Sequence, residues 1–317
     1  MSWVLLRNSW IRRFLIRAGA RNRPLRTAAQ TVGWTHFPMR LLRRLALPVF
    51  TLGLAILARS ESPAPAVEMT LLRLPNGERI GLIGAHPGQP SPTLFVLQGT
   101  LDVARADPAY SHVARLLAKH GYMSVLLDAP AHGEDHRPTE PTELNAWRVR
   151  LDQGENFVAN FNTRARAVLD YLVKERYADP KQVAACGTSR GGFLAFHLAA
   201  AEPRIRCVGG IAPVTDLRAL REFKPAQHPE AAEALSLIHV VPQLAGRPAW
   251  MCIGNNDGRV STESAIAFSR ALVQAGAAKV KDGETVPVDL VVNSSAGHRS
   301  SFHDHEILAE WLLEHMK

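Results

Sequence analysis

The sequence predicts an α/β fold in which one mostly parallel sheet carries helices on both faces. From residue 68 onward, short apolar runs alternate with longer segments of helical spacing. The runs are continuously apolar, as in parallel strands that are buried on both sides. The chain has 317 residues, of which 46% are hydrophobic and 21% charged. This is the composition of an ordinary globular protein, and the length suffices for one large domain.

The folded region is expected to begin with an N-terminal β-hairpin. Two strand-like segments, 68–74 and 79–85, flank the turn sequence Pro75-Asn76-Gly77-Glu78. Asn-Gly between strand-like runs is a strong signal for a tight turn, because both residues tolerate a positive φ. The hairpin therefore supplies the first two strands of the sheet.

The remaining elements alternate between strand and helix. The segment 108–119 has helical spacing and stops at His120-Gly121, where glycine is a typical C-terminal cap. The segment 155–176 predicts a long amphipathic helix. The expected strands are 93–97, 123–127, 183–186, 205–211, 249–253 and 286–292, and the other expected helices are 193–201, 262–275 and 307–316.

The net charge of +8 is concentrated at the start of the chain. Residues 1–66 hold eleven arginines and one acidic residue, Glu61, whereas the rest of the chain holds 26 basic and 28 acidic side chains. The basic pI therefore does not indicate nucleic-acid binding, and no nucleic-acid partner is expected.

Residues 1–66 are interpreted as a basic leader with a signal peptide. From Met39 a basic segment precedes an apolar run, 45–58, and the cleavage sequence Ala64-Pro65-Ala66. The run is shorter than the roughly 20 residues that span a bilayer. A secreted or periplasmic protein is therefore expected, with membrane contact only through the leader; an uncleaved anchor, a basic surface helix or a transit peptide is the alternative. Met39 is interpreted as the true start, which makes 1–38 an extension.

The three cysteines, Cys186, Cys207 and Cys252, are expected to be buried reduced thiols. Each falls in a separate apolar run, where cysteine behaves as a small hydrophobic residue. The odd count and the absence of Cys-x-x-Cys argue against a disulfide framework or a metal site.

The strongest functional motif stands between the fifth strand and the helix that follows it. Gly187-Thr188-Ser189-Arg190-Gly191 has the pattern Gly-x-Ser-x-Gly, and strand, sharp turn and helix are the context of a nucleophile elbow. The turn strains the backbone of Ser189, and only flanking glycines let strand and helix pack so closely. Ser189 is therefore expected to be a nucleophile; a simple helix N-cap is the alternative.

A serine nucleophile needs a base to take its proton and an acid to orient that base. Asp257 follows the seventh strand and His298 follows the eighth. Because the carboxyl ends of parallel strands meet at one edge of the sheet, Ser189, Asp257 and His298 are expected to form a catalytic triad. Asp216 is the rival acid, and the rival bases are His303 and His305.

No metal and no cofactor are expected. His303-Asp304-His305 has a superficial likeness to a metal site, but no other ligand cluster stands near it in the sequence. His132 and His136, on the loop after the fourth strand, are expected to stabilise that loop or to face the substrate. Asp128 is expected to organise its own turn through backbone hydrogen bonds.

These motifs resemble the α/β-hydrolase superfamily, and within it the dienelactone hydrolases and the catalytic domain of prolyl oligopeptidases. The resemblance rests on Gly187–Gly192, on Asp257-Gly258-Arg259-Val260 and on Gly297-His298. The loop Asp128–Gly133 is also similar to the turn after the fourth strand of these proteins. The α/β-hydrolase domain is accordingly assigned to residues 67–317, and the resemblance implies a serine hydrolase that forms an acyl-enzyme.

The resemblance and the expected geometry together place the oxyanion hole at the backbone N–H groups of Arg190 and Thr100, with Leu101 as the alternative to Thr100. The chain departs from the family at Gln98-Gly99, where the family usually has His-Gly. The Arg190 side chain is similar to that of glucuronoyl esterases, in which an arginine follows the serine. It is expected either to contact substrate or to lie on the surface.

A polar, partly helical segment, 214–246, separates the sixth and seventh strands. In this architecture such a short cap segment is expected to lie over the nucleophile and to shape the acyl pocket. Its charged residues leave only scattered apolar side chains. Long acyl chains need a continuous apolar surface, since each buried CH₂ contributes about 0.8 kcal/mol. Small or polar acyl groups are therefore expected.

The sequence predicts an exported carboxylic-ester hydrolase with a small-molecule ester as substrate. A peptidase of the prolyl-oligopeptidase type is the first alternative, but the chain is short for the β-propeller that restricts access in those enzymes. An acyltransferase and a non-catalytic hydrolase-like binding protein are the others.

Overall fold

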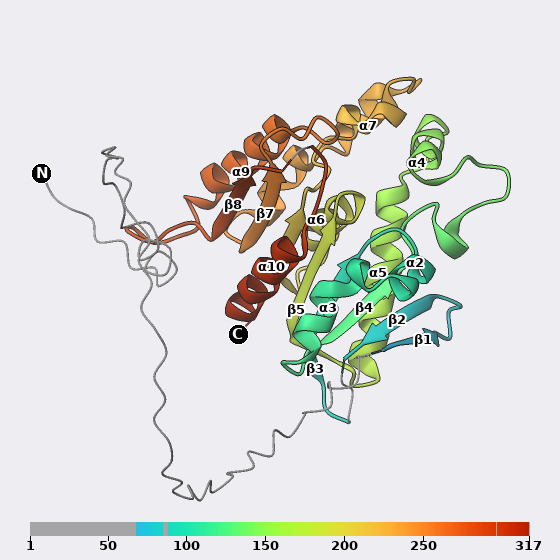
Figure 1. Cartoon of the computed structure of the whole chain (residues 1–317), viewed down its shortest axis with the longest axis vertical. Coiled ribbons are helices and arrows are strands. Elements are labelled where there is room, and N and C mark those ends of the chain that lie inside the picture. Colours follow the sequence, from blue (N-terminus) through green and yellow to red (C-terminus); the bar gives the residue numbers. More distant parts are fainter. Residues whose placement is uncertain (1–67, 85–87, 296, 317) are drawn as a thin grey trace, which may run out of the picture. The chain divides into compact units, whose positions relative to one another are not determined.

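A computed structural model describes residues 68–84, 88–295 and 297–316 (Figure 1). Within them, eight strands form one sheet in the order β1-β2-β4-β3-β5-β6-β7-β8, which confirms the expected α/β fold. The leader lies outside the described residues. The strands are β1 (Met69–Arg73), β2 (Arg79–Ile83), β3 (Ser91–Leu97), β4 (Met123–Leu127), β5 (Ala178–Thr188), β6 (Ile205–Ile211), β7 (Ala249–Gly254) and β8 (Val288–Asn293).

Helices connect most of these strands. The α-helices are α2 (Leu101–Ala106), α3 (His112–Ala118), α4 (Glu143–Asp152), α5 (Phe157–Lys174), α6 (Arg190–Ala201), α7 (Pro229–Ala234), α8 (Val241–Leu244), α9 (Thr262–Gly276) and α10 (Phe302–His315). Short 3₁₀ turns are η1 (Pro108–Ser111), η2 (Gly133–Asp135), η3 (Leu217–Ala219), η4 (Arg221–Phe223) and η5 (Leu237–Val240).

The expected N-terminal hairpin is confirmed. β1 and β2 are antiparallel, with Met69 opposite Ile83. Gly77 in the turn has a φ of 87°, a left-handed conformation that glycine adopts without strain. β2 also pairs antiparallel with β4, and every later pair of neighbours is parallel. The sheet is therefore mostly parallel.

Several element boundaries differ from those expected. β5 begins at Ala178 because this residue pairs with Ser91 of β3. The helix expected over 108–119 divides into η1 and α3. α10 begins at Phe302 because Ser301 and Asp304 form a capping box, in which each side chain accepts from the other residue's backbone.

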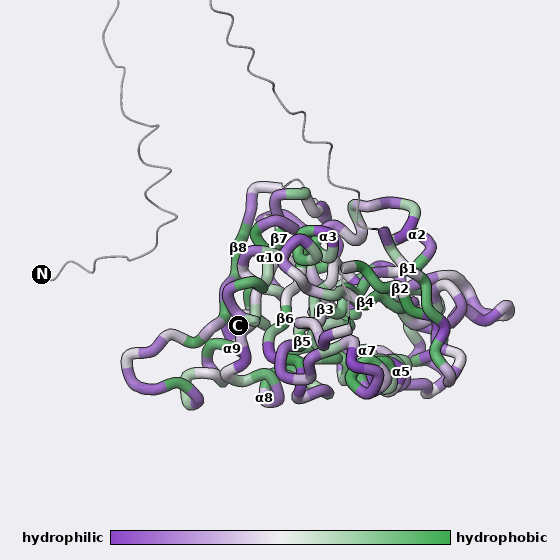
Figure 2. The backbone as a smooth tube through the Cα atoms, turned by 90° about the horizontal axis from the view of Figure 1, so that it is seen from below, coloured by the Kyte–Doolittle hydropathy of each residue, from purple (hydrophilic) through white to green (hydrophobic). Residues whose placement is uncertain are grey.

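Helices cover both faces of the sheet (Figure 1). Buried side chains of α4, α5, α6 and α9 pack on one face, and those of α2, α3 and α10 pack on the other. Side chains along β5 alternate between the two, as in any strand: Val183 and Ala185 face the first layer, whereas Ala184 and Cys186 face the second. Figure 2 shows hydrophobic colour along the central strands. The three cysteines are free and buried, as expected.

The strand order places the functional loops together. β3 lies between β4 and β5, so the loops that leave β3 and β5 start side by side. Open α/β sheets bind ligands at such a position, beyond the carboxyl ends of the strands. The carboxyl ends of β6, β7 and β8 lie along the same edge, because these strands are parallel to β5.

The segment between β6 and β7 packs on the core. Its apolar side chains are buried, among them Val214, Leu217, Leu220, Phe223 and Leu237. It contributes to the layer that also holds α4, α5, α6 and α9. Of the helices that the structure describes, none combines the length and the apolar stretch required to cross a bilayer.

Candidate active site

Ser189 lies in the sharp turn between β5 and α6, as the sequence predicts. Its φ of 54° and ψ of −115° are strained for a residue that has a Cβ. Its backbone N–H donates to the Ile211 carbonyl at 2.8 Å, and its carbonyl accepts from Val214 N–H at 3.1 Å. These contacts hold the strained turn against the end of β6, and the Ser189 side chain lines a pocket there.

Close packing around the turn requires the two flanking glycines. A Cβ on Gly187 would stand 2.6 Å from the Leu97 carbonyl oxygen and would overlap the backbone of Gly191. A Cβ on Gly191 would overlap the same Leu97 carbonyl. Any side chain at either position would force β3, β5 and α6 apart, as the Gly-x-Ser-x-Gly motif predicts.

Ser189, His298 and Asp257 come together in one hydrogen-bond chain. Ser189 Oγ lies 2.9 Å from His298 Nε2, and His298 Nδ1 lies 2.8 Å from Asp257 Oδ2. The His298 side chain is 26% exposed, whereas that of Asp257 is 0% exposed. Because Asp257 can only accept when ionised, the ring carries its proton on Nδ1 and leaves Nε2 free to accept from the Ser189 hydroxyl.

The loop after β7 folds around the Asp257 carboxylate. The backbone N–H groups of Arg259 and Val260 donate to Asp257 Oδ1 at 3.0 and 3.2 Å, so the second oxygen is left to His298. The Arg259 guanidinium forms two hydrogen bonds with Glu222, at 2.7 and 2.8 Å. This pair ties the acid loop to the segment between β6 and β7.

The rival residues lie elsewhere. Asp216 caps η3 through Arg218 N–H and pairs with the Arg218 guanidinium. His303 has a side chain that is 74% exposed, and its Nδ1 lies 3.6 Å from Glu306 Oε2. His305 is buried in α10. Among these histidines, His298 is the one that hydrogen-bonds Ser189.

One of the two candidates for the second oxyanion donor is occupied. The Leu101 N–H donates to the buried Asp128 Oδ1 at 2.7 Å, so it points away from an incoming oxyanion. No hydrogen bond within the described residues engages the N–H of Thr100 or of Arg190. Thr100 and Arg190 both line the pocket around Ser189, which leaves Thr100 as the better candidate.

The pocket around Ser189 has a volume of about 320 Å³. None of its lining residues belongs to 214–246, so the expectation that this segment shapes the acyl pocket is wrong. The reason is packing, since the apolar residues of the segment are buried in the core. The lining residues are Gln98, Gly99, Thr100, Val103, Tyr110, His132, Glu143, Thr188, Ser189, Arg190 and His298.

The Arg190 side chain lies in this pocket between two polar partners. Its Nη1 contacts His132 Nε2 and donates to Glu143 Oε2 at 2.9 Å. His132 Nδ1 lies 2.7 Å from the Pro130 carbonyl, so this nitrogen carries the proton and Nε2 accepts from Arg190. Burial lowers the pKa of His132, the bond to Pro130 opposes this, and the Arg190 charge lowers the pKa further. The neutral ring therefore fixes the guanidinium next to Ser189.

Glu143 and Tyr110 were not singled out from the sequence. Glu143 begins α4, a helix that is not among those expected from the sequence. The buried residues Leu144, Trp147 and Leu151 recur at helical spacing, a signal that would have placed the helix. His132 stabilises its loop through the contact of Nδ1 with the Pro130 carbonyl, as expected. It also lines the pocket around Ser189, and a contact with substrate stays a prediction. Within 68–84, 88–295 and 297–316, no group of three or more His, Cys, Asp or Glu is placed to hold a metal ion.

Known proteins provide an independent comparison. Residues 108–317 match the model of the prolyl oligopeptidase family. Esterase YjfP of Escherichia coli is 26% identical over an alignment of 186 residues, which covers 54% of this chain and 72% of that protein.

Similar solved structures share the fold at low sequence identity. TT1662 from Thermus thermophilus has a TM-score of 0.59 at 19% identity and covers 79% of this chain and 98% of its own. An esterase from an Arctic intertidal metagenomic library has a TM-score of 0.57 at 17% identity, covering 81% and 97%. Acylaminoacyl peptidase from Pyrococcus horikoshii has a TM-score of 0.60 at 14% identity, covering 80% and 42%.

The matched family region begins before β4 and runs through α10, so it contains the elbow, the acid loop and the histidine loop. The similar structures have the same fold, with helices on both faces of a mostly parallel sheet. The chain therefore belongs to the prolyl oligopeptidase family of the α/β-hydrolase superfamily, and it is a serine hydrolase.

Proposed function

We propose that this protein hydrolyses carboxylic esters through an acyl-enzyme on Ser189. His298 Nε2 takes the proton of the Ser189 hydroxyl as Oγ attacks the carbonyl carbon. Asp257 holds the imidazole and stabilises the imidazolium that forms. Nε2 then gives the proton to the leaving alcohol, and a water molecule hydrolyses the acyl-enzyme by the same proton transfers.

The observation that carries this proposal is the hydrogen-bond chain from Ser189 through His298 to Asp257. Its two contacts, 2.9 and 2.8 Å, are within the range at which a general base takes a proton. Asp257 is held by two backbone N–H groups on its other oxygen. It therefore orients the imidazole without reorganising during the reaction.

The oxyanion is proposed to bind the N–H groups of Arg190 and Thr100. Arg190 is the first residue of α6, and the first N–H groups of a helix have no intrahelical acceptor. The loop after β3 supplies Thr100, which lines the same pocket. A single donor of this kind is worth about 10²–10³ in kcat.

The acyl group is proposed to be small or polar. The pocket around Ser189 has Arg190, His132 and Glu143 along one wall. A long acyl chain that lay against this cluster would desolvate the guanidinium and the carboxylate without replacing their hydration. Val103 and Tyr110 are the large apolar side chains among the residues that line the pocket.

An ester is favoured over a peptide by two named relatives. Esterase YjfP and the Arctic esterase are both matched over most of their own lengths. The acylaminoacyl peptidase is matched over 42% of its length, so more than half of that peptidase has no counterpart in the alignment. Because the matched family is that of the prolyl oligopeptidases, a peptidase is the second candidate function.

Parallel substrate panels test the proposal. We expect kcat/KM to be highest for p-nitrophenyl esters of two to four carbons and to fall toward sixteen carbons. Dipeptidyl p-nitroanilides should be cleaved far more slowly than the short esters. A steady rise of kcat/KM toward long acyl chains would contradict the small acyl group, and faster cleavage of the anilides would make the protein a peptidase.

A further inference from the structure

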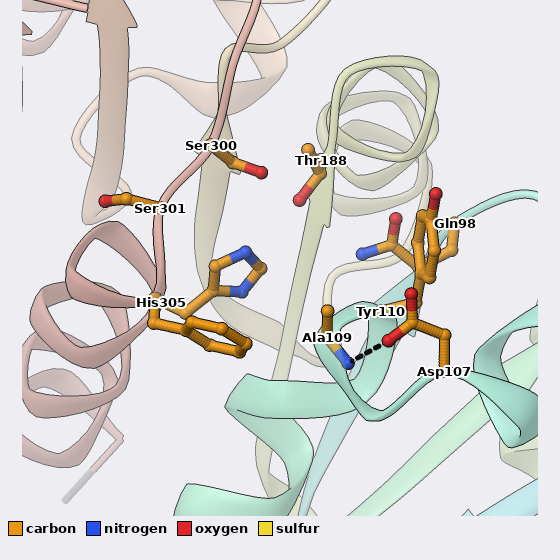
Figure 3. Close-up of a pocket in the computed structure, with 9 residues that line it drawn as sticks. Gln98, Asp107, Ala109, Tyr110, Thr188, Ser300, Ser301 and His305 are labelled. Carbon is orange, nitrogen blue, oxygen red and sulfur yellow. Dashed lines mark hydrogen bonds between the residues drawn. The ribbon is translucent and has the colours of Figure 1, made fainter.

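A second cavity, of about 390 Å³, lies beside the pocket around Ser189, between η1 and the start of α10 (Figure 3). The two spaces share Gln98, Tyr110 and Thr188, so one ligand can occupy both. Thr188 directly precedes the nucleophile, and through the shared residues the second cavity adjoins the pocket that Ser189 and His298 line. Its other lining residues are Asp107, Ala109, Ser300, Ser301, Phe302 and His305.

His305 is a buried polar group that the proposed mechanism does not use. The residue is 7% exposed, and its Nδ1 has no hydrogen-bond partner among the described residues. Figure 3 shows the ring on the α10 side of the cavity, across from Tyr110 and Gln98. Nδ1 itself is closed to solvent, so a ligand in the cavity can reach only the Nε2 edge of the ring, which has no hydrogen bond within the described residues. A ligand with a polar group at this wall would give Nε2 a hydrogen-bond partner.

The imidazole is neutral near pH 7. Burial lowers the pKa of His305 to about 4, and the neighbouring His112 lowers it further. A neutral ring offers one N–H and one lone pair. It can therefore hydrogen-bond a hydroxyl as donor or as acceptor, and it does not repel or attract a charge.

Two aromatic side chains give the cavity apolar walls. Tyr110 is 45% exposed and Phe302 is 58% exposed. The Phe302 ring is held edge-on against His112, with 4.8 Å between ring centroids. Aromatic faces pack against the flat faces of a ring, whereas Gln98 and Thr188 offer polar groups at its edge. The chemistry of the cavity thus fits a ring that carries hydroxyl groups.

We propose that this cavity binds the alcohol arm of the ester, and that His305 selects alcohols whose ring carries hydroxyl groups. This inference rests on the proposed function. His298 must protonate the leaving oxygen, so the alcohol arm begins within reach of His298, which lines the pocket around Ser189. From there the arm can enter the cavity past the shared residues, and Ser300 and Phe302, which follow His298 in the chain, line that cavity. The Arg190 wall of the pocket around Ser189 is left for the acyl arm.

Acetate esters with matched alcohols test this inference. Glucose 6-acetate and cyclohexylmethyl acetate have rings with and without hydroxyl groups, and 4-hydroxyphenethyl acetate and phenethyl acetate are the aromatic pair. The His305→Phe variant keeps the size of the side chain. It should lower kcat/KM for the hydroxylated member of at least one pair by about tenfold, the effect of one lost hydrogen bond, and change the other member less than about twofold. The pair in which the hydroxylated ester loses activity shows whether the preferred alcohol is a sugar or a phenol.

All four esters form the same acetyl-enzyme, which separates the two arms of the substrate. The rate of deacylation, measured after a burst with p-nitrophenyl acetate, should not change in His305→Phe. His303→Phe is the matched control, because His303 lies on the same turn with a side chain that is 74% exposed. It should leave both alcohol pairs and deacylation unchanged.

Exposed wall residues keep the test decisive if His305→Phe does not fold. Phe302→Ala and Tyr110→Ala should lower kcat/KM for all four ring acetates relative to ethyl acetate. Unchanged discrimination within both pairs by a folded His305→Phe would overturn this inference alone. So would wall variants that affect ethyl acetate as much as the ring acetates. A wild-type protein that hydrolyses none of the acetates would overturn the proposed function and this inference with it.

Discussion

At the scale of single residues, the position of the base separates His298 from its neighbours. Its two ring nitrogens contact Ser189 Oγ and Asp257 Oδ2 at once. His303, five residues later in the chain, has a side chain that is 74% exposed. A side chain in solvent has no fixed geometry toward the nucleophile, so it cannot substitute for His298.

Replacing the two histidines separately tests this assignment. His298→Ala should lower kcat by about 10³-fold or more, and adding Ser189→Ala should make it little worse, since triad members act as a unit. His303→Ala should retain most of the activity. Steady-state hydrolysis of p-nitrophenyl acetate measures the activity of each variant, and circular dichroism checks that each variant is folded. If His303→Ala lost more activity than His298→Ala, the general base would be His303 in α10.

The triad could be predicted from the sequence because each member follows its own strand. Ser189, Asp257 and His298 come after β5, β7 and β8, and a parallel sheet brings these ends to one edge. The contacts of Arg190 could not be predicted in this way. They depend on how α4 packs, which is set by distant contacts such as that of Trp147 with the Pro130 carbonyl.

At the scale of elements, Asp128 links the loop after β4 to the start of α2. Its Oδ1 accepts from Leu101 N–H at 2.7 Å, and its Oδ2 accepts from Glu134 N–H at 3.1 Å and from Arg79 at 3.2 Å. The carboxylate thereby anchors the first residue of α2. Thr100, the proposed oxyanion donor, is the N-cap of that helix. Asp128 is therefore a positioning residue for the oxyanion loop.

Asp128→Ala should lower kcat for acetate esters by about tenfold or more while KM changes little, because donors that bind the oxyanion act in the transition state. Asp128→Asn should retain more activity, since its carbonyl oxygen can still accept from Leu101. Asp102→Asn is the control: Asp102 also pairs with Arg79, but its side chain is 67% exposed. A folded Asp128→Ala variant with wild-type kcat would show that the loop does not need this anchor.

Most strands could be predicted, whereas α2 and α4 are not among the expected helices. β4 and β6 have the expected bounds because most of their residues are apolar and all but Arg206 are buried. α2 has only six residues, too few for a periodic pattern, and its Thr100 cap and tertiary contacts stabilise it. In α4 the apolar residues have helical spacing, but they stand among charged side chains, which makes the pattern harder to recognise.

At the scale of the whole molecule, buried imidazoles couple folding to pH. Burial lowers the pKa of His197 to about 4, with a smaller opposing contribution from its bond to the Leu235 carbonyl. The pKa of His305 is likewise lowered to about 4. An imidazole in the unfolded chain has a pKa near 6.5. As pH falls from about 6.5 to about 4, the unfolded state gains protons that the native state does not, so the free energy of unfolding falls.

His197→Gln should make the free energy of unfolding less dependent on pH in this window. Each of the two histidines contributes a slope of up to about 1.4 kcal/mol per pH unit, and the variant lacks one of them. Urea unfolding at several pH values between 7 and 4.5 measures the slope for both proteins. Equal slopes would mean that His197 is not a source of acid lability.

The leader carries a further prediction at this scale. We propose that residues 39–66 direct export, on the basis of their basic, apolar and Ala-x-Ala segments in order. Expression in a host with an export pathway should give a mature protein that begins near Val67. N-terminal sequencing of the exported product measures this. A product that keeps residues 39–66 would indicate a membrane-anchored form instead.

Every step of the proposed mechanism depends on Ser189 as the nucleophile. The most direct measurement is labelling with a fluorophosphonate, which reacts covalently with an activated serine, followed by peptide mapping by mass spectrometry. We expect one adduct, on the peptide that contains Ser189, and loss of both the adduct and ester hydrolysis in a folded Ser189→Ala variant. An adduct on another residue, or labelling and turnover that persist in Ser189→Ala, would contradict it.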